Sequence, residues 1–142
     1  MKYQYGDLMD HLSDYRTVFI TTNAFIKNNG ELVMGRGIAR ACAQRFPTLP
    51  AMAAQRISGG LYGLIPDVCV EEYDPALYGS SDQPQRIAIG LFQVKFNWWD
   101  NASLELVEHS THMLSHLAKT EAFIPENPTM ELRYAGLCLC EV

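Results

Sequence analysis

The stretch RTVFITTNAFIKNNGELVMGRGIARACAQRF, residues 16–46, decides the fold class of this chain. Its first part is rich in β-branched and aromatic side chains, and the apolar run Val18–Ile20 is typical of a strand covered on both faces. The polar cluster at residues 27–30 predicts a turn. From Gly37 to Phe46, apolar side chains recur at helical spacing until Pro47 ends the pattern. The stretch therefore predicts a buried strand, a turn and a helix.

The rest of the chain continues this alternation of strands and helices. The expected strands are Tyr3–Tyr5, Leu61–Tyr73 as one or two strands broken at Pro66 and Asp67, Arg86–Lys95, Phe123–Ile124 and Leu132–Leu139. The expected helices are Pro50–Ile57 and Ala102–Lys119, and residues 74–84 are expected to form a loop. Strands alternating with helices predict an α/β sandwich with a mixed or mostly parallel sheet.

The helix expected over Ala102–Lys119 carries two further patterns. Asp100 and Asn101 precede it and are suitable N-cap residues. The apolar face is expected to comprise Leu104, Val107, Thr111, Leu114 and Leu117. Three histidines also lie at positions that share a face, namely His109, His112 and His116. No carboxylate or cysteine is spaced to complete a metal site with them, so a solvated polar face is favoured.

Composition narrows the class of protein. A length of 142 residues, with 48% hydrophobic and 19% charged residues, predicts one globular domain spanning residues 1–142. A net charge of −5 argues against general nucleic-acid binding, which needs a basic face. No apolar run approaches the ~20 residues of a membrane span, and the N-terminus lacks a hydrophobic signal segment. We therefore expect a cytoplasmic protein without membrane contact. The spacing of its four cysteines does not match a disulfide framework, so we expect them to be reduced thiols.

The segment Val33–Ala41 is the strongest candidate for ligand binding. Two glycines at the entrance of a helix let backbone N–H groups approach a ligand, and the helix dipole favours an anion there. The segment matches neither the P-loop, which needs Gly-Lys-Ser/Thr, nor the dinucleotide fingerprint, which needs glycine or alanine in place of Arg40. Four basic residues against one acid between Lys27 and Arg45 favour a small anionic ligand. The alternative is that these arginines cover the outer face of a surface helix.

Four motifs follow one another along the chain. They are Tyr5-Gly6-Asp7-Leu8, Thr21-Thr22-Asn23-Ala24, Gly30 with Val33-Met34-Gly35-Arg36-Gly37-Ile38-Ala39, and Val94-Lys95-Phe96-Asn97-Trp98-Trp99-Asp100 with the residues to Val107. Together they resemble the macro domain family, in its branch similar to the ADP-ribosyl-glutamate hydrolases, and the fourth looks like a bacterial and phage subgroup. The resemblance covers residues 3–119 and leaves 120–142 as a divergent tail. It implies a three-layer α/β/α sandwich with a mixed central sheet and shortened C-terminal elements.

The resemblance also implies a set of ADP-ribose-binding residues. Asp7 would contact the adenine amino group with Leu8 beside it, and Asn23 would lie near the distal ribose. Asn29 is a second candidate for that asparagine, because an insertion makes the alignment ambiguous. The loop around the diphosphate and distal ribose would comprise Met34, Gly35, Arg36, Gly37, Ile38 and Ala39. This placement agrees with the expectation of backbone donors at a helix N-terminus.

Lys95 is the catalytic residue that the resemblance implies. In this branch a lysine at the end of the strand attacks the anomeric carbon of the ribose and forms a covalent adduct. A nucleophilic lysine must first lose its proton, and neighbouring aromatic side chains would supply a dry environment. The alternative is an exposed lysine at a strand end. The adjacent pair Trp98-Trp99 suits base or sugar stacking, but core packing at the corner between strand and helix is favoured.

The C-terminal part departs from the family pattern. The family's second glycine-rich loop, with its catalytic acid, has no counterpart in residues 126–130, and Glu126 or Glu131 would have to substitute for that acid. Three functions remain: an ADP-ribosyl hydrolase, a module that binds ADP-ribose, or a truncated protein that acts as an oligomeric structural module. The missing acid favours binding over catalysis. We expect ADP-ribose or an ADP-ribosylated macromolecule as partner, a homodimer, and neither metal nor cofactor.

Overall fold

A computed structural model describes residues 6–15, 17–72, 85–121 and 135–138. Its elements are the 3-10 helix η1 (Leu8–Asp14), β1 (Thr17–Thr22), α1 (Gly37–Arg45), α2 (Leu49–Ser58), β2 (Leu64–Glu72), β3 (Gln85–Gln93), α4 (Leu104–Glu121) and β4 (Ala135–Cys138). The strands and helices predicted within these ranges are therefore confirmed, with bounds that differ by a few residues. The strands predicted at residues 3–5 and 123–124 and the loop at 74–84 lie outside the described residues.

The four strands form one mixed sheet in the order β2-β3-β1-β4. β1 pairs in parallel with both β3 and β4, with Val18 opposite Ile89 on one side and Gly136 on the other. β2 runs antiparallel to β3, and its register shifts between Ile65 and Val68, where proline and aspartate stand. Proline has no N–H to donate to the hydrogen-bond ladder, so the pairing is interrupted there. The break predicted at this proline is therefore an irregularity within one strand.

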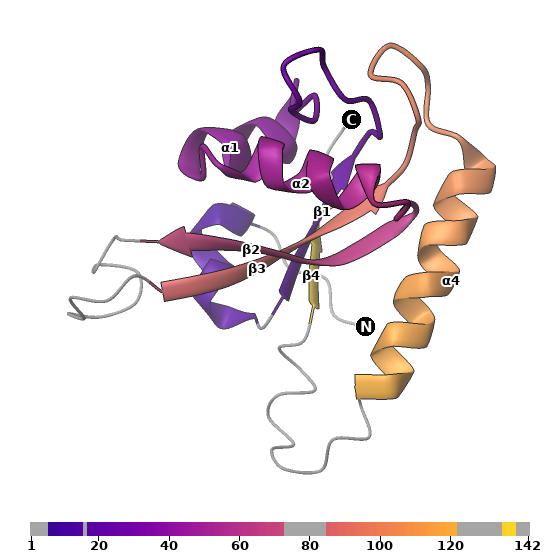
Figure 1. The fold of residues 1–142 in the computed structure, drawn as a ribbon. Coiled ribbons are helices and arrows are strands. Elements are labelled where there is room, and N and C mark those ends of the chain that lie inside the picture. Colours follow the sequence, from indigo (N-terminus) through magenta and orange to yellow (C-terminus); the bar gives the residue numbers. More distant parts are fainter. Residues whose placement is uncertain (1–5, 16, 73–84, 122–134, 139–142) are drawn as a thin grey trace.

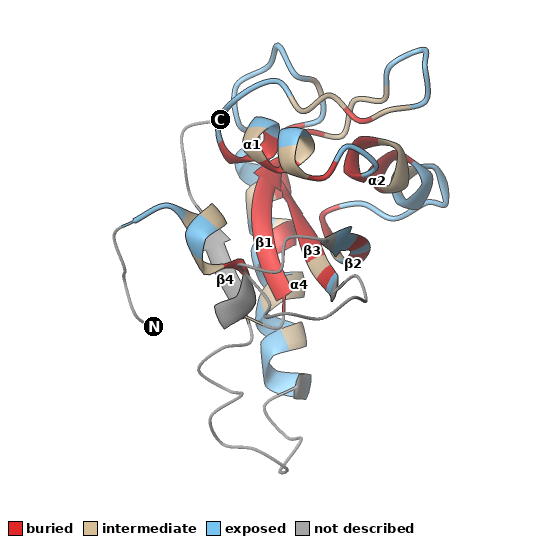
Figure 2. Ribbon diagram, turned by 90° about the vertical axis from the view of Figure 1, so that its left-hand side faces the viewer, coloured by how far each residue is buried: buried red, intermediate tan, exposed pale blue. Residues whose placement is uncertain are grey.

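Helices cover both faces of the sheet (Figure 1). Successive residues of a strand point to opposite faces, and β1 is buried along its whole length (Figure 2). Val18 and Ile20 belong to the core that η1, α1 and α2 cover, whereas Phe19 packs on the other face with Val107 and Leu114 of α4. The three-layer α/β/α sandwich with a mixed sheet is thus confirmed. Within the described residues, no helix is long and apolar enough to cross a membrane.

The start and the buried face of α4 differ from the prediction. Ser103, rather than Asp100 or Asn101, accepts a hydrogen bond at this end, from the backbone N of Leu106 to Oγ at 3.3 Å. Leu104 is 73% exposed and Thr111 is exposed as well, so the assignment of both to the buried face is wrong, and Leu106 is buried instead. The fully buried Ser110 donates a 2.8 Å hydrogen bond to the carbonyl of Gln93. This polar contact helps to orient the helix. It could not be predicted from the spacing of hydrophobic residues.

Candidate ligand-binding site

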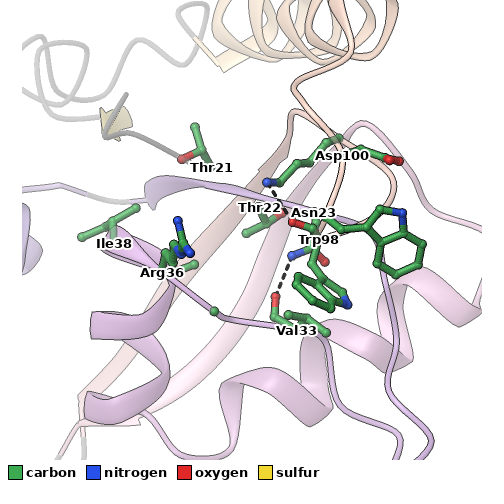
Figure 3. Close-up of a pocket in the computed structure, with 12 residues that line it drawn as sticks. Thr21, Thr22, Asn23, Val33, Arg36, Ile38, Trp98 and Asp100 are labelled. Atoms are coloured by element: carbon green, nitrogen blue, oxygen red, sulfur yellow. Dashed lines mark hydrogen bonds between the residues drawn. The ribbon is translucent and has the colours of Figure 1, made fainter.

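A pocket of about 480 Å³ opens where the parallel strands β1 and β3 end. Such carboxyl-terminal edges are the usual place for ligands in α/β proteins, and the volume suits a small molecule. The pocket is lined by Thr21, Thr22 and Asn23 after β1, by Val33, Gly35, Arg36, Ile38 and Ala39 at the start of α1, and by Lys95, Trp98, Trp99 and Asp100 after β3. In the view of Figure 3, Arg36 and Ile38 lie on one side of it and Trp98 and Asp100 on the other.

The N-terminus of α1 forms one wall of the pocket. Its N-cap residue, Arg36, makes no capping hydrogen bond with its side chain, and the first turn contains no acidic residue. Gly37 has a φ of +56°, a left-handed conformation that glycine adopts without strain. The first backbone N–H groups of a helix have no partner within the helix, and with the dipole they favour an anion. The wall is therefore suited to a phosphate or carboxylate.

Asn23 connects the end of β1 to this glycine loop. The residue is 7% exposed, and its side chain uses both ends of its amide. Nδ2 donates to the carbonyl of Val33 at 2.9 Å, and Oδ1 accepts from the N–H of Phe25 at 2.9 Å. The N–H of Val33 in turn donates to the carbonyl of Phe25 at 3.0 Å. Asn23 thereby fixes the position of the loop and has one amide hydrogen left for a ligand.

Asn29, the alternative asparagine, lies away from the pocket in an exposed turn. The predicted turn at residues 27–30 is confirmed, with Gly30 at a φ of +83°. The Asn29 side chain accepts from the N–H of Glu31 at 3.1 Å and donates to its carboxylate at 3.3 Å. Of the two asparagines, the structure places only Asn23 on the pocket.

Lys95 is a buried residue that lines the pocket, two residues after the end of β3. The residue is 9% exposed, so the alternative of a solvent-exposed lysine is wrong. Nζ donates to the carbonyl of Trp98 at 3.1 Å, and no carboxylate of the described residues pairs with it. An ammonium group has three hydrogens to donate, and burying one without full partners is costly. This arrangement suits a group that completes its hydrogen bonds with a ligand.

The two tryptophans after Lys95 are on the surface. Trp98 is 54% and Trp99 58% exposed, so the prediction that they pack in the core is wrong. Their rings meet edge to face at 5.5 Å, and Trp99 packs in the same manner on Phe25 at 5.2 Å. Polar contacts hold the turn that carries them, because Asn97 donates to the carboxylate of Asp100 at 2.9 Å. The turn therefore does not depend on burying the tryptophans.

Asp7 and Leu8 lie outside the lining of the pocket. Asp7 caps η1 by accepting a 3.0 Å hydrogen bond from the N–H of Met9, and it is exposed. Leu8 is half-buried and packs on the core beneath α1 and α2. Burial, together with the negative charge of Asp7, raises the pKa of the Cys42 thiol on α1 to about 12. Asp7 is thus close enough to α1 to act on it electrostatically.

The structure brings most of the predicted site residues together. Those that line the pocket are Asn23, Gly35, Arg36, Ile38, Ala39 and Lys95. Met34 and Gly37 belong to the same loop and stand next to lining residues, whereas Asp7, Leu8 and Asn29 do not line it. Six lining residues were not predicted as site residues, namely Thr21, Thr22, Val33, Trp98, Trp99 and Asp100. Their proximity in sequence to Asn23, Gly35 and Lys95 was the available signal.

A sandwich of this topology, with a pocket between a glycine loop and a buried lysine, defines a protein with the macrodomain fold. The macrodomain of Mycobacterium tuberculosis DarG is similar, with a TM-score of 0.56 and 20% identity over 95% of this chain and 94% of that one. Thermosipho africanus DarTG, solved in complex with ADP-ribose, gives a TM-score of 0.55 and 16% identity over 92% of this chain. The match spans 40% of the Thermosipho chain. No protein-family model and no curated protein sequence matches this chain.

Proposed function

We propose that the pocket binds ADP-ribose. The observation that carries this proposal is the uncapped N-terminus of α1, which shares one pocket with the buried ammonium of Lys95. Both are positive features: the helix N-terminus suits the diphosphate of ADP-ribose, and the ammonium suits the hydroxyl oxygens of its distal ribose. The macrodomain fold, and the presence of ADP-ribose in the similar Thermosipho protein, support this choice of ligand.

The proposed orientation follows from the charges around the pocket. The diphosphate lies against the N–H groups of Ile38 and Ala39, with the guanidinium of Arg36 beside it. The distal ribose then lies between Asn23 and Lys95, which come from the two parallel strand ends. We assign Asp7 and Leu8 to the adenine end, outside the lining of the described pocket.

Removal of ADP-ribose from a modified macromolecule is a second candidate function. It is favoured by the burial of Lys95, whose unprotonated amine would attack the anomeric carbon of the distal ribose. The bond from that carbon to the macromolecule would break as the C–N bond forms, and the leaving atom of the macromolecule would take up a proton. Asp100 is the only carboxylate among the described lining residues. It already accepts a hydrogen bond from Asn97 and points away from Thr22 and Asn23 (Figure 3). The described site thus offers Lys95 no adjacent acid, and we place binding ahead of turnover.

Calorimetric titration with ADP-ribose tests the binding function. We expect a dissociation constant in the micromolar range, which corresponds to a free energy of binding on the order of −8 kcal/mol. Arg36→Gln should weaken binding about tenfold, because it removes a cation from the pocket. Arg40→Gln is the matched control, since Arg40 is exposed on the same helix outside the pocket and its loss changes net charge equally. The absence of binding by the wild-type protein, or an equal effect of both substitutions, would contradict the proposal.

The cytoplasmic location and the homodimer expected from the sequence remain predictions. For the homodimer, light scattering should give a molar mass of twice 16.0 kDa. A mass of 16.0 kDa at the concentrations used for binding would reject it.

A further inference from the structure

Trp98 and Trp99 form an exposed aromatic surface at the edge of the pocket, which we call the tryptophan ledge. Both line the pocket, and each residue is more than half exposed. Trp99 is braced by Phe25, whereas the ring contact of Trp98 within the described residues is with Trp99. An edge-to-face pair covers only part of each indole. The ledge therefore offers aromatic surface to a ligand without any rearrangement of the core.

The ledge is tied directly to Lys95. The Nζ atom of Lys95 donates to the carbonyl of Trp98, so the ammonium and the ledge belong to one rigid turn. The next residues of this turn are fixed in the same way, because the N–H of Ser103 donates to the carbonyl of Val94 at 2.8 Å. If the distal ribose of ADP-ribose lies beside Lys95, any group attached to its anomeric carbon lies next to the ledge.

We propose that the tryptophan ledge is a subsite for a planar aromatic ring carried on the anomeric carbon of the distal ribose. This inference rests on the proposed function and extends it, because ADP-ribose itself has no such ring. An aromatic ring stacks on an indole face with an energy that changes affinity by roughly tenfold or more. The indole N–H of each tryptophan is in addition a donor for an amide or carbonyl on that ring. The ledge thus selects for the group beyond the ribose, whereas the glycine loop recognises the diphosphate.

The chain suits a direct test because it contains two tryptophans, and both are in the ledge. Intrinsic tryptophan fluorescence therefore reports on the ledge alone. The probes are ADP-ribose and NAD⁺, which carries a nicotinamide ring on the same ribose carbon. We expect NAD⁺ to bind about tenfold more tightly than ADP-ribose and to quench the tryptophan emission more strongly at saturation.

Substitutions separate stacking from a structural role. Trp98→Ala should remove the advantage of NAD⁺, so that NAD⁺ and ADP-ribose bind with about equal affinity, while Trp98→Phe keeps most of the advantage. Phe96→Ala is the matched control, since Phe96 is equally exposed in the same turn but does not line the pocket. It should leave both affinities unchanged.

Three outcomes would overturn the inference. If ADP-ribose binds but NAD⁺ binds no more tightly and does not alter the fluorescence further, the ledge is no subsite, although the proposed function stands. If Trp98→Ala weakens both ligands equally, Trp98 supports the pocket instead of selecting a ring. If neither ligand binds, the proposed function and the inference fail together.

Discussion

Replacing Asn23 with alanine is the most informative single change to the pocket. The substitution removes both amide hydrogen bonds that join the end of β1 to the glycine loop, to the carbonyl of Val33 and from the N–H of Phe25. Both bonds are 2.9 Å long and partly buried, so water replaces them poorly. The loop then loses its fixed position relative to Lys95.

The size of the effect follows from the two bonds. Each contributes about 1 kcal/mol, and leaving a partly buried backbone group without a partner adds to the loss. We expect Asn23→Ala to lower the free energy of unfolding by about 2–3 kcal/mol. It should also weaken ADP-ribose binding about tenfold, because the donors at the start of α1 are no longer held in place.

Urea unfolding and calorimetry measure these two quantities, and Asn29→Ala is the matched control. Asn29 makes the same kinds of local bond, to Glu31, but in an exposed turn away from the pocket. Its substitution should cost less than about 0.5 kcal/mol and leave binding unchanged. The reasoning is refuted if Asn23→Ala is as mild as this control, or if Asn29→Ala weakens binding as much.

Three further predictions concern the core, a thiol and the buried lysine. Gly90→Ala should destabilise the protein by about 3 kcal/mol in urea unfolding, because a Cβ there overlaps the ring of Phe19; an unchanged midpoint would contradict this packing. Burial raises the pKa of Cys42 from its ordinary value of 9.0 to about 12, so mass spectrometry at about pH 8 should find iodoacetamide on the exposed Cys69 and not on Cys42. Because the unfolded thiol ionises first, stability should fall as the pH rises from about 9 towards 12, and a flat profile would argue against this burial. Lys95→Met should weaken ADP-ribose binding about tenfold while raising the free energy of unfolding by about 1 kcal/mol, whereas a loss of stability would show a structural role for the ammonium.

Much of the fold was predictable because its signals are local. The buried strand at residues 17–22 shows β-branched residues without a polar interruption, and α1 begins at a glycine and ends before a proline. The residue at which α4 begins and the face that this helix buries were harder to predict. They depend on Ser103 as a cap and on the contact of Ser110 with β3, and both are tertiary features of ordinary serines.

The site divides in the same way. The glycine loop is readable in sequence because it combines glycines with a helix start within a few residues. The choice between Asn23 and Asn29 was not readable, because it depends on a hydrogen bond to Val33, ten residues from Asn23 along the chain. The exposure of Trp98 could not be predicted either, since a short turn closed by its own polar contacts needs no aromatic core.

A crystal structure of the chain with ADP-ribose would show directly whether the pocket binds this ligand. We expect the diphosphate within hydrogen-bond distance of the backbone N–H groups of Ile38 and Ala39, with the distal ribose in contact with Nζ of Lys95. ADP-ribose bound elsewhere, or an empty pocket after soaking at saturating concentration, would contradict this expectation.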